Sequence, residues 1–182
     1  AAPKYAVTIP HGSHVEKLPG FEDGAFAVQD PATLNAVELL DVAPGMRVLD
    51  ACSAPGGKTV QLALRMEGEG YVLAADCWED RLQPLRDNLK RFGLSKLVAV
   101  EQLDARKVSL ADVGERFDRI LLDVPCSNTG VQRRRADAKW RFSPDRLKEL
   151  NDTQYAILSN ASKLLLPGGK LVYSTCSLEK EE

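Results

Sequence analysis

The chain has 182 residues, of which 44% are hydrophobic and 27% are charged, and this is enough for one well-buried domain. Its formal net charge of −2 is not typical of a nucleic-acid-binding domain, so such a role would need a local basic patch or a further domain. No apolar stretch approaches the roughly 20 residues of a membrane-spanning helix, and the N-terminus has no secretory pattern, which predicts a cytoplasmic protein. The four cysteines form no Cys-x-x-Cys pair, so neither a metal site nor a disulfide framework is expected.

The N-terminal part is rich in proline, glycine and histidine. Residues 1–20 are expected to be an entry segment or a linker from something upstream, and residues 21–182 to form one domain. Because the sequence begins with Ala1-Ala2-Pro3 and not with methionine, we expect an excised piece of a longer protein.

Apolar runs with strand character alternate with helical patterns along the rest of the chain. Strands are predicted at 46–49, 71–75, 97–103, 117–122 and 170–174. Helices are predicted at 31–42, 60–66, 79–92 and 144–166, the last closed by Pro167-Gly168-Gly169, and 124–142 is expected to be a polar loop. This alternation predicts an α/β fold with a mostly parallel sheet flanked by helices, whose ligands bind at the carboxyl ends of the strands.

The segment Asp50–Thr59, DACSAPGGKT, lies between the first strand and the next helix and is predicted to be a cofactor cradle. Three interpretations compete, namely a nucleotide P-loop, a dinucleotide fingerprint and the first motif of an S-adenosylmethionine methyltransferase. The P-loop pattern requires a glycine where Cys52 stands, and Pro55 interrupts the loop that would wrap phosphate. The GxGxxG spacing of dinucleotide sites is absent. A structural turn without a ligand remains open.

Acidic residues follow the next three predicted strands, as Asp76, Asp104 and Asp123. An acid at the end of the second strand commonly binds a ribose, although Asp76 could instead cap the helix that follows it. Two thiols stand at the same edge, because Cys126 follows the fourth strand and Cys176 the fifth. A buried structural role is usual for a single cysteine, but the shared position favours chemistry. A thiolate that adds to carbon 6 of a pyrimidine makes carbon 5 nucleophilic toward a methyl donor.

These motifs resemble the catalytic domain of the Sun (Fmu) family of S-adenosylmethionine-dependent RNA cytosine-5 methyltransferases, which includes a bacterial 16S ribosomal RNA enzyme. The resemblance rests on GAFAVQD (24–30), CSAPGGK (52–58), DVPCSNTG (123–130) and YSTCS (173–177) followed by two glutamates. It implies a Rossmann-like methyltransferase fold, with Cys176 as the nucleophile, Cys126 assisting product release and Asp123 at the junction of cofactor and base. It further implies that the cofactor is bound by Cys52, Ser53, Ala54, Pro55, Gly56, Gly57, Lys58, Asp76 at the ribose and Asp104 at the adenine.

The family fold normally continues with a further helix and two strands, so the C-terminal strands are expected to be missing here. An upstream RNA-binding domain is also common in the family, which leaves one basic cluster as the candidate RNA contact: Arg133, Arg134, Arg135, Lys139 and Arg141. A merely solvated loop explains this cluster equally well. A P-loop-like nucleotide hydrolase and a catalytically incomplete RNA-binding or assembly module remain the alternative functions, and the sequence predicts no oligomeric state.

Overall fold

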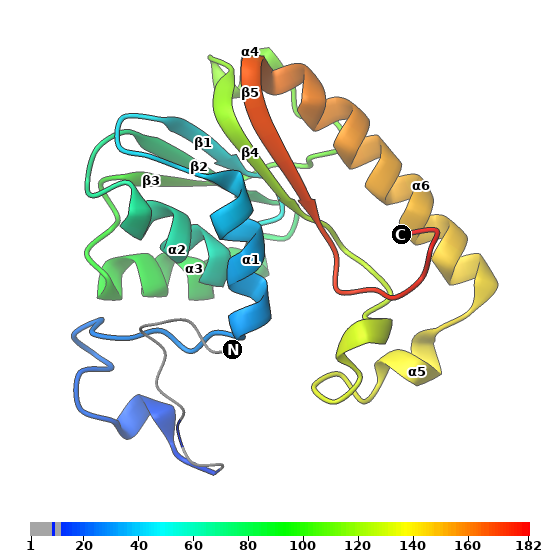
Figure 1. The fold of residues 1–182 in the computed structure, drawn as a ribbon, viewed down its shortest axis with the longest axis horizontal. Helices are drawn as coiled ribbons and strands as arrows, with labels where there is room; N and C mark the ends of the chain where they lie inside the picture. The colour runs from blue at the N-terminus through cyan, green and yellow to red at the C-terminus, as the bar shows by residue number, and fades with distance from the viewer. Residues whose placement is uncertain (1–8, 10–11) are drawn as a thin grey trace.

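The computed structural model describes residue 9 and residues 12–182, and its centre is one parallel sheet of five strands (Figure 1). The strands are β1 (Arg47–Asp50), β2 (Tyr71–Asp76), β3 (Val98–Gln102), β4 (Phe117–Asp123) and β5 (Leu165–Ser174). They lie in the order β3-β2-β1-β4-β5, so the direction of winding reverses between β1 and β4. In open parallel sheets this reversal opens a crevice at the carboxyl ends of the strands, where ligands bind.

Helices cover both faces of the sheet, as Figure 1 shows. One face packs against α1 (Pro31–Leu40), α2 (Gly57–Arg65) and α3 (Glu79–Arg91), and the other against α4 (Leu110–Val113) and α6 (Pro144–Ala161). Neighbouring residues of a strand point to opposite faces, so Val48 joins the first core and Leu49 the second. This two-sided burial explains why the strands are nearly continuous apolar runs. The Rossmann-like fold predicted from the sequence is therefore confirmed.

Two helices begin where the sequence provides a cap and a proline. The Asp30 side chain accepts a hydrogen bond from the Ala32 N–H at 2.9 Å, and Pro31 occupies the first turn of α1. The Ser143 hydroxyl accepts from the Arg146 N–H at 3.2 Å, and Pro144 opens α6 in the same way. Such caps stabilise a helix by about 1 kcal/mol each.

The predicted helix over 144–166 is wrong at its end. Helix α6 ends at Ala161, a 3-10 turn η3 (Ser162–Leu164) follows, and β5 already begins at Leu165. Pro167-Gly168-Gly169 lie inside this strand rather than closing the helix. Phe117 pairs with Leu165 but Arg119 pairs with Lys170, so residues 166–169 bulge out of the ladder. Within the described residues β5 is an edge strand, where proline, glycine and bulges are tolerated.

The segment 124–142 contains two short helical turns that the loop prediction omitted, η2 (Thr129–Val131) and α5 (Ala138–Arg141). The short helix α4 was also not predicted. Within the expected entry segment, the structure describes residue 9 and a 3-10 turn η1 (Val15–Lys17), while residues 1–8, 10 and 11 lie outside the described part. None of the described helices is long and apolar enough to cross a membrane.

Candidate active site

The cradle follows β1 as predicted, but α2 begins at Gly57, before the predicted residue 60, so the last residues of the cradle form the first turn of the helix. Gly56 has φ +105°, and a Cβ at this position would lie 2.4 Å from the Leu85 Cδ1 atom. A Cβ on Gly57 would lie 2.5 Å from Gln29 Oε1. The space that a Cβ would occupy at both glycines is thus filled by protein side chains. The glycines are required for the turn and for close packing.

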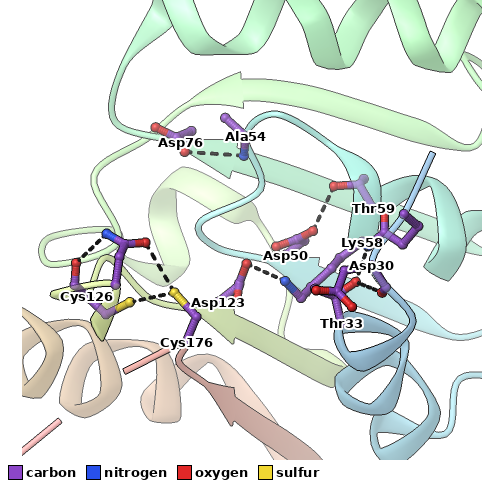
Figure 2. A network of polar contacts seen from close by, with 12 residues as sticks. Asp30, Thr33, Asp50, Ala54, Lys58, Thr59, Asp76, Asp123, Cys126 and Cys176 are labelled. Atoms are coloured by element: carbon purple, nitrogen blue, oxygen red, sulfur yellow. Dashed lines mark hydrogen bonds and ion pairs between the residues drawn. The ribbon is translucent and has the colours of Figure 1, made fainter. Parts of the chain in front are cut away.

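The side chains of Lys58 and Thr59 point to protein partners and not to a phosphate site. Lys58 Nζ donates to Asp123 Oδ2 at 2.5 Å, and the fully buried Thr59 hydroxyl donates to Asp50 Oδ2 at 2.7 Å (Figure 2). In a P-loop the lysine reaches the phosphates and the hydroxyl binds magnesium. This geometry argues against the nucleotide hydrolase.

Asp50, which ends β1, is a buried carboxylate that the sequence analysis did not single out. Burial raises its pKa to about 7, despite the hydrogen bond from Thr59. Asp50 Oδ1 and the Ser53 hydroxyl are buried and have no hydrogen-bond partner within the described residues. The signal that could have found Asp50 is its position, since it ends a strand as Asp76 and Asp123 do.

Asp76 ends β2 and binds both the cradle and the start of α3. Its carboxylate accepts from the Ala54 N–H at 3.3 Å and from the Trp78 N–H at 3.1 Å, and Arg81 lies 3.4 Å away. The N-cap residue of α3 is Trp78, so Asp76 is not itself the cap. Asp104 lies two residues beyond β3. Its pKa is lowered, mainly by the hydrogen bond from the Arg106 side chain.

The two predicted thiols meet. Cys126 Sγ and Cys176 Sγ are 3.1 Å apart, because β4 and β5 are neighbours, and Asn128 Oδ1 lies 3.2 Å from the Cys176 sulfur (Figure 2). The hydrogen bond from Cys176 lowers the pKa of Cys126 to about 6, although burial opposes this shift. The same contact and burial raise the pKa of Cys176. Burial likewise raises the pKa of Cys52.

The basic cluster separates in the structure. Arg134 forms an ion pair with Asp30, and Lys139 Nζ lies 4.7 Å from the centroid of the Trp140 ring. Arg133 is exposed on the surface. Arg135 and Arg141 line a cavity together with Cys126. Arg146 of α6 lines the same cavity and was not predicted.

Two residues that were not predicted, Gln154 on α6 and Glu182, support the loop that carries Cys126. Gln154 Nε2 donates to the Pro125 carbonyl at 2.9 Å and to Glu182 Oε1 at 2.8 Å. A polar side chain on the apolar face of a predicted helix was the available signal for Gln154. Across the described residues, no three His, Cys, Asp or Glu side chains are grouped as a metal site requires.

Comparisons with known proteins place the chain in a family. The family model described as 16S rRNA methyltransferase RsmB/F matches residues 37–182. Ribosomal RNA small subunit methyltransferase B of Vibrio cholerae is 45% identical over 97% of this chain and 42% of its own length. The crystal structure of NSun6 from Pyrococcus horikoshii with SFG matches with a TM-score of 0.83 at 36% identity, over 93% of this chain and 42% of that one.

A methyltransferase homologue from Pyrococcus horikoshii matches with a TM-score of 0.80 at 35% identity, over 93% of this chain and 52% of that chain. The chain therefore spans about two fifths of the Vibrio relative and about half of this structure. The match covers both the cradle and the two thiols. The chain belongs to the RsmB/F family of 16S rRNA methyltransferases, for which S-adenosylmethionine is the methyl donor.

Proposed function

We propose that this domain, residues 21–182, methylates carbon 5 of a cytosine in ribosomal RNA through a covalent cysteine adduct at carbon 6. The observation that carries the proposal is the pair of thiols of Cys126 and Cys176, which are 3.1 Å apart at the ends of neighbouring strands. Methyl transfer to a nitrogen or oxygen needs no thiol nucleophile, whereas methylation of a pyrimidine carbon does. Asp123 ends β4, three residues before Cys126.

The cradle suits S-adenosylmethionine. Helix α2 begins at Gly57, so its first N–H groups lack intrahelical acceptors and suit the carboxylate of the methionine part. The unpartnered buried oxygens of Asp50 and Ser53 suit the donors of a bound ligand, and Asp76 stands where a ribose binds in related sheets. Asp104 is proposed to contact the adenine side. Bound here, the cofactor supplies an electrophilic methyl group.

Cys176 is the proposed nucleophile, and Cys126 is its proton partner. Cys126 is proposed as the thiolate of the resting pair, because the Cys176 sulfur has an acceptor for its proton in Asn128 Oδ1 at 3.2 Å and the hydrogen bond from Cys176 lowers the pKa of Cys126. As the Cys176 sulfur bonds to carbon 6, its proton passes to Cys126 and the ring electrons move to carbon 5. After methyl transfer, the carbon 5 proton leaves to water and the carbon–sulfur bond breaks. Cys126 then returns the proton to the departing Cys176 sulfur.

Asp123 is proposed to hold the base during this addition. Within the described residues the Asp123 side chain has one hydrogen bond, which Oδ2 accepts from the Lys58 ammonium. The second oxygen is left to accept from the exocyclic amine of cytosine or to hold a proton at the ring nitrogen. Lys58 thus orients the carboxylate for the base.

The RNA contact is proposed at the cavity beside Cys126. Arg135, Arg141 and Arg146 line it. The Arg141 and Arg146 side chains are 80% and 60% exposed, and their partners Asp137 and Glu149 are surface carboxylates, so both arginines can exchange these pairs for a phosphate. Arg133, Arg134 and Lys139 stay as outer candidates. The target base must be withdrawn from its stack to reach the thiols.

The decisive experiment compares Cys176→Ala with Cys126→Ala in the intact protein, given ribosomal RNA and S-adenosylmethionine. We expect the Cys176 variant to form neither 5-methylcytidine nor a covalent complex, and the Cys126 variant to accumulate a slow-migrating RNA adduct on a denaturing gel. The reverse pattern would make Cys126 the nucleophile. Methylation retained by both variants would refute the mechanism, and a wild-type protein that binds RNA but never methylates it would favour the assembly module.

A further inference from the structure

The chain after β5 turns back toward α6, and its last residues lie beside the loop that carries Cys126 (Figure 1). The Ser127 N–H donates to both carboxylate oxygens of Glu182, at 2.9 and 3.2 Å. Gln154 Nε2 donates to Glu182 Oε1 at 2.8 Å and to the Pro125 carbonyl at 2.9 Å. The residues on either side of Cys126 are thus both held, one by Gln154 and the other by Glu182.

We infer that Glu182 is a positioning residue that, together with Gln154, fixes the loop 125–128 so that the Cys126 sulfur faces Cys176. The inference rests on the proposed function for its consequence, since Cys126 matters only as the partner of the nucleophile. Its geometric part stands alone, because the contacts among Glu182, Ser127 and Gln154 involve no substrate.

A carboxylate is the side chain that this position requires. The donors that converge on Glu182 come from Ser127, Ser177 and Gln154, and a carboxylate accepts from all of them, whereas an amide would present a donor of its own. Burial raises the pKa of Glu182, but these hydrogen bonds together outweigh burial and hold the pKa below its ordinary value. Gln154 is only 2% exposed, so its amide cannot turn to water if Glu182 is lost.

Other contacts already join the loop that carries Cys126 to the loop that carries Cys176. The Gly130 N–H donates to the Cys176 carbonyl at 3.0 Å, and a Cβ on Gly130 would lie 2.6 Å from that oxygen. The Ser127 and Ser177 hydroxyls are 3.0 Å apart. These contacts fix the separation of the loops, and Glu182 adds the constraint on the residue next to Cys126. Removing its charge should therefore disturb the sulfur contact without separating the loops.

The pKa of the Cys126 thiol reports whether the loop has moved. Its sulfur accepts from the side chains of Cys176 and Thr175 and from the Asn128 and Cys176 N–H groups. Asp123 and Tyr173 are further titratable groups close to the pair, and the charged groups that line the adjoining cavity are Arg135, Asp137, Arg141 and Arg146. A loop that moves loses several of these donors at once, and the thiol then returns toward an ordinary pKa of about 8.5.

The test follows alkylation of Cys126 by iodoacetamide from pH 5 to 9, with mass spectrometry to separate it from the exposed Cys77. We expect the midpoint to rise from about 6 toward about 8.5 in Glu182→Gln and to stay in place in Glu181→Gln, its exposed neighbour. With RNA, Glu182→Gln should accumulate the covalent adduct as Cys126→Ala does. Its dissociation constant for S-adenosylmethionine should stay within about twofold of the wild-type value.

An unchanged midpoint in folded Glu182→Gln overturns the inference, as does an equal rise in Glu181→Gln. If Glu182→Gln does not fold, Gln154→Met takes its place, because methionine lacks the amide donor and fills a similar volume. An unchanged midpoint in that variant also overturns the inference. If the midpoint rises but the wild-type protein methylates no cytosine, the proposed function fails and the positioning role stands.

Discussion

Asp76→Ala separates a cofactor-binding role from a structural one most clearly. Asp76 is 3% exposed and accepts from the N–H groups of Ala54 and Trp78, at 3.3 and 3.1 Å. It also pairs with Arg81, whose Nη2 atom donates to the Ala54 carbonyl at 3.0 Å. The substitution therefore removes an acceptor from both sides of the cradle and leaves Ala54 held by Arg81 alone.

The expected size of the effect follows from these contacts. A buried donor left without an acceptor costs about 1–3 kcal/mol, and a ribose left without its acceptor costs a similar amount of binding free energy. We expect the dissociation constant for S-adenosylmethionine to rise roughly 5- to 150-fold, at 1.4 kcal/mol per tenfold change. The melting temperature should fall by about 2–4 °C for each kcal/mol of lost stability.

Isothermal titration calorimetry of the folded variant with S-adenosylmethionine measures the first effect and calorimetric melting the second. Asp104→Ala is the matched comparison, because that carboxylate is 26% exposed and pairs with the nearby Arg106 at 2.7 Å. It should weaken binding less. A dissociation constant that is unchanged in Asp76→Ala, together with a lowered melting temperature, would mean that Asp76 only supports α3 and the cradle.

Two further predictions concern the RNA cavity and the buried acid of β1. Arg146→Ala should reduce the salt dependence of RNA binding by about one phosphate contact, whereas Lys148→Ala, on the same helix but outside the cavity lining, should not, and equal effects would refute a specific contact. Asp50 has a folded-state pKa of about 7, above its unfolded value, so its contribution to stability is complete below pH 4 and is lost as pH rises through 7. Melting curves of the cofactor-free protein should show this loss in the wild type and not in Asp50→Asn, and parallel pH profiles of the two would contradict it.

The sequence was sufficient for the five strands and the four longer helices in chain order, and for the edge of the sheet at which the polar residues gather. The strands are apolar because helices bury both faces of the sheet, and that pattern is visible without coordinates. The strands are parallel, so their carboxyl ends share one edge, and residues that follow a strand must gather there. Asp76, Asp123, Cys126 and Cys176 were placed together by this argument, and the structure confirms their placement.

The sequence misplaced the start of β5 because Pro167-Gly168-Gly169 is a general signal for a break. Whether such a break closes a helix or bulges from an edge strand depends on pairing with β4, some 50 residues earlier in the chain. Local propensity contains no information about that partner, so the prediction extended the helix by five residues.

Only the tertiary structure decided which polar side chains bind one another. Lys58 reaches Asp123 across 65 residues of sequence, Cys176 reaches Cys126 across 50, and Glu182 reaches Ser127 across 55. The sequence alone determined that charged and nucleophilic groups converge on one edge, since this follows from strand direction. Which of them pair depends on distances of a few ångströms that only packing sets, because hydrogen bonds weaken steeply with distance and angle.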